Sequence, residues 1–132
     1  MSSSLYSCCK CSLLLSRLLN KRGYEAEVID SRGWTMVGVA GRKVEYAADM
    51  ADYYDLIVGL HPDEALRPVV ESAKTRPIIV VPCCNFWDKS KKLGRDALLD
   101  EIENYFKNND IKFERVTFDF KGPQNLGLLT FS

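Results

Sequence analysis

Residues 55–61 read DLIVGLH and residues 77–85 read PIIVVPCCN, and these two stretches decide the fold. Each contains a continuous apolar run, at 56–60 and 77–81, which is the pattern of a parallel strand buried on both faces. A helical run at about residues 64–74 separates them, and Pro68 lies early in it, where a proline costs least. A strand, a helix and a second strand in this order predict two parallel strands of a helix-covered sheet.

The same alternation extends toward both ends of the chain. Upstream we expect a first strand at 5–7, a helix from about 13 to 22 with Ser12 as its N-cap, a second strand at 25–29 and a third at 44–47. Downstream we expect a helix at 95–108 and strands at 111–118 and 126–131, joined by a turn at 122–125. Residues 1–132 are therefore predicted to form one α/β domain. Its sheet is doubly wound and mostly parallel, with a C-terminal antiparallel hairpin.

Composition excludes several classes of protein. The 132 residues are 46% apolar and 27% charged, which suits one soluble globular domain. The chain has 18 Lys plus Arg and 18 Asp plus Glu, so its formal net charge is zero. No overall charge therefore attracts it to nucleic acid or to a membrane surface. No apolar stretch approaches the ~20 residues of a membrane-spanning helix, and the first residues lack a signal-peptide pattern. We expect a cytoplasmic protein with no membrane partner.

The 5 cysteines fall in two tight clusters, CCKC at 8–11 and CC at 83–84. Adjacent cysteines and an odd count do not suit a disulfide framework. Both clusters follow predicted strands, so with the single histidine they are expected at one edge of the sheet. No metal site is predicted, because neither Cys-Cys pair has the usual two-residue spacer of zinc sites and a lone Cys-Lys-Cys is a weak signal. A metal site formed by Cys8, Cys11, His61, Cys83 and Cys84 stays the alternative, as does a reactive thiol beside Lys10.

Polar side chains also follow the predicted strands. Asp30 follows the second strand, Asp49 lies just beyond the third, and Asn85 comes shortly after the fifth. Ligands of open α/β sheets bind outside the carboxyl ends of the strands, near the point where the strand order reverses. A ligand site is therefore predicted at this edge of the sheet.

Two motifs carry a family resemblance. Gly59-Leu60-His61 ends the fourth predicted strand and Pro82-Cys83-Cys84 ends the fifth, with one helix between them. The chain thereby resembles the class I S-adenosylmethionine-dependent methyltransferases, and most of all a branch with these two motifs. Some members of that branch are similar to RNA-modifying enzymes. The resemblance covers nearly the whole chain. It implies a minimal Rossmann-like methyltransferase fold, S-adenosylmethionine as cofactor, and RNA or another nucleotide-containing molecule as substrate.

The resemblance also implies roles for individual residues. The loop after the first strand would wrap the methionine part of the cofactor, which places Cys9 and Cys11 against it. Asp30 would accept hydrogen bonds from the ribose hydroxyls, Asp49 would contact the adenine amino group, and Leu60 would line the same site. His61 and Asn85 are the catalytic candidates. The candidate substrate contacts are Pro82, Cys83, Cys84, Phe86 and Trp87.

Two alternatives stay open. Cys9 and Cys11 stand where the family has glycines, which favours a degenerate, non-catalytic domain that binds a nucleotide or a protein partner. A zinc or redox-thiol module is the second alternative.

Phe86 and Trp87, with the basic residues at 89–95, are either an RNA-stacking patch or the solvated start of a helix. An edge strand in the terminal hairpin can pair two copies, so a homodimer also stays open.

Overall fold

The computed structural model describes residues 2–6, 11–31, 39–82, 85–119 and 125–131. The strands are β1 (Ser2–Tyr6), β2 (Glu25–Ile29), β3 (Ala40–Arg42), β4 (Leu56–Leu60), β5 (Ile78–Val81), β6 (Phe113–Thr117) and β7 (Leu126–Thr130). The α-helices are α1 (Cys11–Lys21), α2 (Leu66–Glu71) and α3 (Arg95–Asn108). Short 3-10 helices are η1 (Ala48–Tyr53), η2 (Asp63–Ala65) and η3 (Ser72–Lys74).

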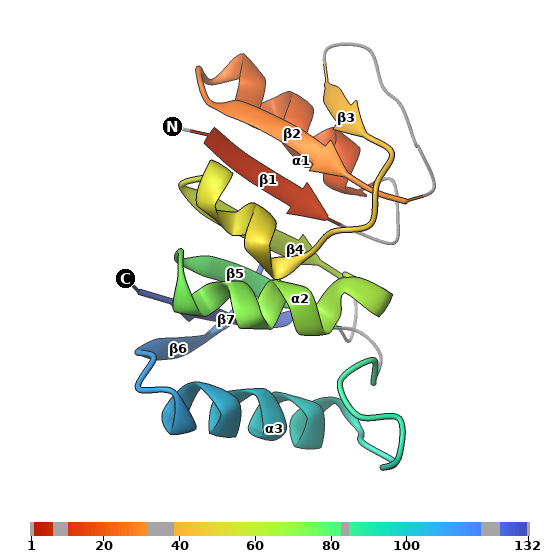
Figure 1. The fold of residues 1–132 in the computed structure, drawn as a ribbon, viewed down its shortest axis with the longest axis vertical. Helices are drawn as coiled ribbons and strands as arrows, with labels where there is room; N and C mark the ends of the chain where they lie inside the picture. Colours follow the sequence, from red (N-terminus) through yellow and green to blue (C-terminus); the bar gives the residue numbers. More distant parts are fainter. Residues whose placement is uncertain (1, 7–10, 32–38, 83–84, 120–124, 132) are drawn as a thin grey trace.

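The strands form one mixed sheet in the order β3-β2-β1-β4-β5-β7-β6 (Figure 1). The strands from β3 to β5 pair in parallel. β7 is antiparallel to both of its neighbours, β5 and β6. The structure thus confirms an α/β fold with an antiparallel hairpin near the C-terminus. Among the described helices, none has both the length and the apolar character that a membrane span needs.

The main core lies on the face of the sheet that carries η1, α2 and α3. Ile29, Ile57 and Ile78 of the strands pack there with α2 and α3 residues such as Val69 and Phe106, all at most 1% exposed. The neighbouring strand residues Val28 and Val58 face the other way, because successive side chains of a strand alternate between faces. They pack with Leu15 and Leu19 of α1. α1 therefore covers the opposite face, over the half of the sheet around β2.

Strong local patterns predicted their elements well. β2, β4 and α3 have the predicted bounds, and β5, β6 and β7 lie within theirs. The helix expected at 64–74 is divided into η2, α2 and η3. α1 begins at Cys11, so Ser12 lies inside the helix and its prediction as the N-cap is wrong. The predicted turn lies mostly outside the described residues.

The third strand was predicted at the wrong place. β3 is Ala40–Arg42, paired with Glu27–Ile29 of β2. Residues 44–47 alternate in polarity like a strand, but Tyr46 is turned into the main core and is 1% exposed. Its hydroxyl lies 2.6 Å from Ser72 Oγ, and Ser72 Oγ itself donates to the carbonyl oxygen of Pro68. Tyr46 is therefore the donor to Ser72, which ties this segment to α2 and η3.

Candidate functional site

The strand order reverses at β1, and the candidate site lies beside this reversal, at the carboxyl ends of the parallel strands. β1 lies between β2 and β4, so the chain leaves β1 toward one side of the sheet and later continues from β4 toward the other. Such a reversal opens a crevice where ligands bind in open α/β sheets. Tyr6 pairs with Gly59 and Leu60 pairs with Val81, so these strands end near one another. We call this edge the carboxyl-end rim.

Asp30 is the buried carboxylate of the carboxyl-end rim. It directly follows β2 and is 4% exposed. Its backbone N–H donates to the carbonyl oxygen of Arg42 over 3.0 Å, which continues the β2–β3 pairing by one residue. The strand pairing thus holds Asp30 beside the reversal between β1 and β4. A carboxylate at the end of the second strand is the group that holds ribose hydroxyls in doubly wound nucleotide-binding sheets.

His61 makes a sharp bend at the end of β4. Its backbone N–H donates to the carbonyl oxygen of Val81 over 2.8 Å, which joins the ends of β4 and β5. Its φ angle is 50°, in the left-handed region that residues other than glycine seldom adopt. The side chain is half-buried, and the next residue, Pro62, is buried. Strained backbone of this kind is concentrated at functional sites.

The glycine and leucine before His61 have packing roles. A Cβ on Gly59 would lie 3.0 Å from Val69 Cγ1 and 3.4 Å from Pro62 Cβ, so the missing side chain lets α2 approach β4. Leu60 packs with the Val28–Val58 cluster on the α1 side of the sheet. The Gly-Leu-His motif therefore combines close helix packing with a bend at the rim.

Most of the predicted cysteine cluster lies outside the described residues. This applies to Cys8, Cys9, Cys83 and Cys84, and of Cys11 only the backbone, at the start of α1, is described. Among the described residues, no group of three or more His, Cys, Asp and Glu side chains is placed to hold a metal ion. The roles predicted for these five cysteines stay predictions.

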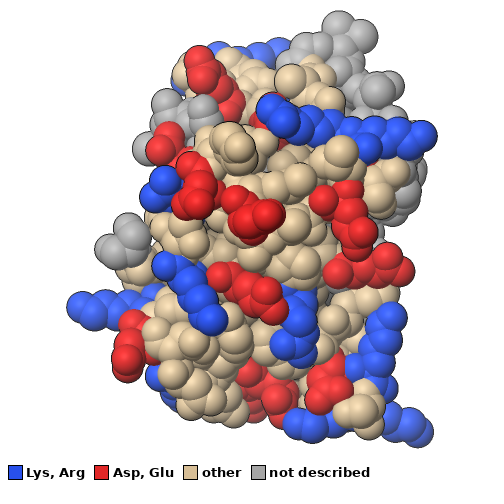
Figure 2. Space-filling model, viewed as in Figure 1, with Lys and Arg blue, Asp and Glu red and all other residues tan. Residues whose placement is uncertain are grey.

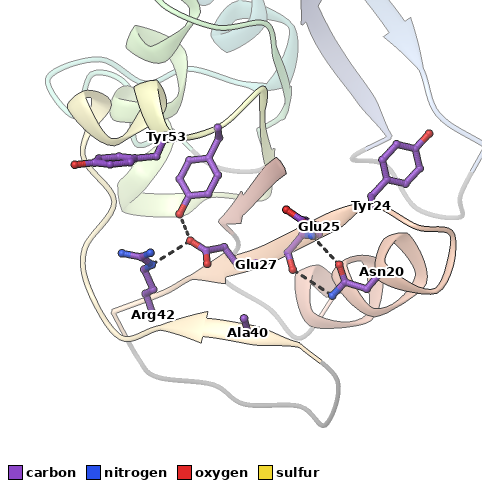
Figure 3. Close-up of a pocket in the computed structure, with 9 residues that line it drawn as sticks. Asn20, Tyr24, Glu25, Glu27, Ala40, Arg42 and Tyr53 are labelled. Carbon is purple, nitrogen blue, oxygen red and sulfur yellow. Dashed lines mark hydrogen bonds and ion pairs between the residues drawn. The ribbon is translucent and has the colours of Figure 1, made fainter. Parts of the chain in front are cut away.

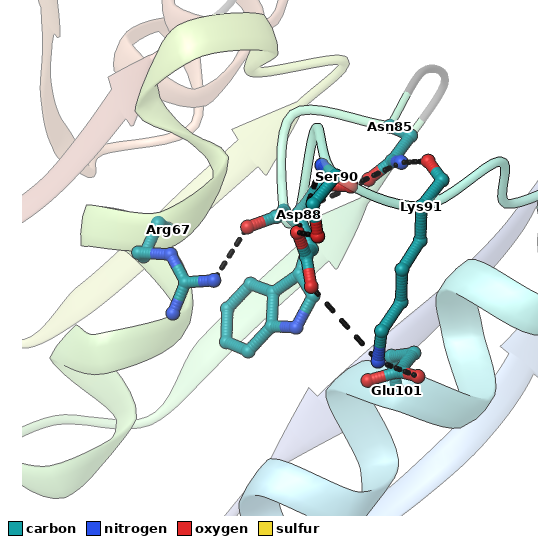
Figure 4. A network of polar contacts seen from close by, with 7 residues as sticks. Arg67, Asn85, Asp88, Ser90, Lys91 and Glu101 are labelled. Carbon is teal, nitrogen blue, oxygen red and sulfur yellow. Dashed lines mark hydrogen bonds and ion pairs between the residues drawn. The ribbon is translucent and has the colours of Figure 1, made fainter.

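Asn85 organises the loop that follows β5 (Figure 4). Its Nδ2 donates to the carbonyl oxygens of Asp88 and Lys91 over 2.7 and 2.8 Å. Its Oδ1 accepts from the backbone N–H of Asp88 over 3.0 Å. Asp88 in turn accepts from the hydroxyl and the backbone N–H of Ser90, and these bonds lower the pKa of Asp88. The Asn85 amide thus uses both its donor and its acceptor groups to shape residues 85–91.

The two aromatic residues of this loop are anchors. Trp87 is 8% exposed, so its indole offers little surface to a substrate base. The guanidinium carbon of Arg67 lies 3.9 Å from the ring centroid, and Arg67 donates a hydrogen bond to the Trp87 carbonyl. The ring of Tyr105 approaches edge-on at 5.4 Å. Trp87 therefore joins α2 to α3, while Phe86 is half-buried against the main core. Pro82, before them, is also buried.

Asp49 does not follow a strand directly. It is an exposed residue of η1, several positions beyond the end of β3. Burial raises the pKa of Tyr46, the hydrogen bond with Ser72 lowers it, and the negative charge of Asp49 raises it by a smaller amount. The expected position at the end of the third strand is wrong, because that strand ends at Arg42. Its role toward adenine stays a prediction.

A pocket away from the carboxyl-end rim was not predicted from the sequence (Figure 3). Its volume is about 580 Å³ and it lies beside the first half of β2. The lining residues are Asn20, Tyr24, Glu25, Ala26, Glu27, Ala40, Arg42, Tyr53 and Tyr54. We call it the β2 pocket. It depends on where β3 begins, and the local pattern around Ala40 does not signal that position.

Comparisons with known proteins add little to this geometry. No protein family matches the chain, and no curated protein matches it. Among solved structures, it is similar to a release factor-specific protein-(glutamine-N5) methyltransferase from Alicyclobacillus acidocaldarius. The two chains share 11% identity over 98% of this chain and 78% of the other, with a TM-score of 0.45. A likeness at this level does not establish a shared function.

Proposed function

We propose that this chain is a small methyltransferase-like domain that binds S-adenosylmethionine at the carboxyl-end rim. The observation that carries the proposal is the buried carboxylate of Asp30 at the end of β2, beside the reversal of strand order between β1 and β4. The mixed sheet is, in this proposal, a minimal doubly wound sheet of the Rossmann-like methyltransferase kind. The Gly59-Leu60-His61 and Pro82-Cys83-Cys84 motifs support the same assignment.

The residues of the rim suit this cofactor. The Asp30 carboxylate is an acceptor, and two adjacent ribose hydroxyls are donors that it would bind together. Leu60 would give apolar surface next to the cofactor, Asp49 would contact the adenine amino group, and Cys9 and Cys11 would lie against the methionine part. When bound, S-adenosylmethionine supplies an electrophilic methyl group. The chain then has to place the substrate nucleophile in line with it, and catalysis rests on that positioning.

A polyanionic substrate such as RNA is supported by the charge next to the rim. Residues 85–95, which follow β5, contain 4 Lys or Arg and 1 Asp or Glu, although the whole chain is neutral. Lys89, Lys92 and Arg95 are exposed in or just after the loop that Asn85 organises. Phosphate groups bind such clusters by electrostatic attraction. In the proposal, His61 faces the substrate from the end of β4, and Asn85 positions the basic loop.

Calorimetry with S-adenosylmethionine and S-adenosylhomocysteine tests the cofactor site. Wild-type protein is expected to bind both, and Asp30→Asn is expected to bind at least about tenfold more weakly, because hydrogen bonds to a charged group are lost. Asp96→Asn is the matched control, since Asp96 lies on α3 with a side chain that is 74% exposed. It should bind like wild type. Circular dichroism confirms that each variant is folded, and absence of binding by folded wild-type protein overturns the proposal.

Methyl transfer is tested with S-adenosylmethionine labelled in its methyl group, with total RNA, total protein and a nucleotide mixture as separate acceptors. His61→Asn suits this assay, because asparagine adopts the left-handed backbone at position 61 more readily than most residues. We expect slower transfer by this variant with unchanged cofactor affinity. Cofactor binding without transfer to RNA, protein or small nucleotides overturns the enzymatic part and supports the non-catalytic binding domain.

A further inference from the structure

The β2 pocket exists because β3 is short. Within the part of the chain that the structure describes, β3 pairs only with Glu27–Ile29, and no described strand lies on that side of the first half of β2. Asn20, at the end of α1, occupies the position of the missing strand: its Nδ2 donates to the Ala26 carbonyl and its Oδ1 accepts from the Ala26 N–H, over 3.2 and 2.6 Å. The backbone of Ala26 is thus satisfied, and the pocket presents side chains rather than an open strand edge.

A fixed carboxylate lies at the centre of the β2 pocket. Glu27 Oε1 accepts a hydrogen bond from the hydroxyl of Tyr54 and lies 3.0 Å from Arg42 Nε (Figure 3). Tyr54 is 7% exposed and belongs to the main core, so it holds Glu27 in a set position. Glu25 lines the same pocket from the same face of β2. Two carboxylates and one guanidinium leave the lining with a net negative charge.

Two exposed phenol rings also line the β2 pocket. Tyr53 is 81% exposed and Tyr24 is 45% exposed, so packing in the core does not explain their presence. Figure 3 shows them at opposite ends of the pocket, with Glu25 and Glu27 between them. The face of an aromatic ring attracts cations, and ammonium and guanidinium groups are recognised in this way.

The surrounding charge favours the same kind of ligand. Residues 44–66, which include η1 and Tyr53, contain 6 Asp or Glu and no Lys or Arg. The guanidinium of Arg76 donates to the carbonyl oxygens of Asp52 and Tyr54 beside them. Figure 2 shows acidic side chains spread over the middle of the face on which η1 lies. These negative charges repel an anionic ligand and attract a cation.

We propose that the β2 pocket binds an organic cation, an ammonium or guanidinium group carried by a free amine or by a basic side chain of a protein. The ring of Tyr53 contacts the cation at one end of the pocket, Tyr24 offers a second aromatic surface at the other end, and Glu25 and Glu27 between them supply the opposite charge. Arg42 and Tyr54 position Glu27. The volume of about 580 Å³ is within the usual range of small-ligand sites. The proposal depends on no property of the carboxyl-end rim.

Amide chemical-shift titration by NMR at low ionic strength tests this site. Spermidine is the free-amine probe, a Lys-Gly repeat peptide is the side-chain probe, and a Glu-Gly repeat peptide is the negative control. We expect saturable shifts at Tyr24, Glu25, Arg42 and Tyr53 with spermidine, with the Lys-Gly peptide, or with both. The probe that binds identifies the source of the cation. Shifts with the Glu-Gly peptide, or with neither cationic probe, overturn the proposal.

Substitutions separate a built site from general attraction to an acidic surface. Tyr53→Ala is expected to weaken binding about threefold or more, and Tyr53→Phe to retain it, because the ring provides the contact. Glu27→Gln should weaken binding by a similar factor. Phe131→Ala is the matched control, since Phe131 is another aromatic residue, 52% exposed. If Tyr53→Ala binds like wild type, the assignment is wrong. Asp30→Asn should leave cation binding unchanged, which separates this test from that of the cofactor site.

Discussion

Gly127 lies in β7 where neighbouring chains leave no space for a side chain. A Cβ at this position would be 2.8 Å from the carbonyl oxygen of Val80, 2.7 Å from Phe118 Cε2 and 2.9 Å from Val81 Cγ2. Val80 belongs to β5, which pairs directly with β7. A backbone carbonyl cannot move away without disturbing that pairing, so Gly127 allows the antiparallel hairpin to dock on the parallel strands.

Gly127→Ala is therefore expected to lower the free energy of unfolding by at least about 2 kcal/mol, as overpacked cores do. Urea denaturation followed by circular dichroism measures the change. Gly94→Ala is the matched control: nothing lies within 4 Å of a Cβ there, and φ is −74°. It should cost less than about 1 kcal/mol, the scale of a changed N-cap. Equal effects of the two substitutions would show that Gly127 is not closely packed.

At the scale of elements, the side-chain amide of Asn20 stabilises the connection from α1 to β2. α1 ends at Lys21, and Asn20 reaches the backbone of Ala26 across the turn at Gly23, whose φ is +91°. Glycine tolerates that conformation at no steric cost. The amide bonds both polar groups of Ala26 on the side that β3 leaves open. One side chain thus replaces a residue of the missing strand.

Asn20→Ala should reduce the free energy of unfolding by about 1–2 kcal/mol, because two partly buried hydrogen bonds are lost and alanine's higher helix propensity offsets only part of the loss. Thermal and urea denaturation provide the measurement. Asn104→Ala, at an exposed position in the middle of α3, controls for propensity and should be neutral or slightly stabilising. A stability of Asn20→Ala equal to that of Asn104→Ala would refute this role.

For the whole molecule, burial is unequal on the two faces of the sheet. The main core joins β4, β5 and β7 to α2 and α3, and its residues include Ile78, Leu99 and Ile102 at 0% exposed. In the described part of the chain, the α1 side buries chiefly Val28 and Val58. All three residues of β3 are exposed. Segments with few buried apolar contacts open at lower free energy than the global unfolding reaction.

Native-state hydrogen exchange, read by mass spectrometry in increasing urea below the transition, should resolve this difference. Amides of β4, β5 and α3 are expected to exchange only through global unfolding. Amides of α1 and β3 are expected to exchange through smaller openings that depend little on urea. Equal protection of α1 and α3 would mean that the two faces of the sheet unfold as one unit.

The sequence by itself determined the elements whose signals are local. The apolar runs at 56–60 and 77–81 and the amphipathic pattern at 95–108 predicted β4, β5 and α3, because a helix or buried strand shows its own periodicity. The order of these elements also predicted that Asp30 and His61 would lie at one edge of the sheet. That conclusion needs only the rule that parallel strands end on the same side.

Only the tertiary structure decided the features that depend on a distant partner. β3 lies at Ala40–Arg42 because β2 pairs with it there, while Tyr46 leaves the strand pattern to bond Ser72. Trp87 is a buried anchor because Arg67 and Tyr105, from α2 and α3, enclose it. The β2 pocket likewise appears only where a short strand leaves its neighbour uncovered. Contacts between segments far apart in the sequence set these positions, so the residues around each position do not predict them.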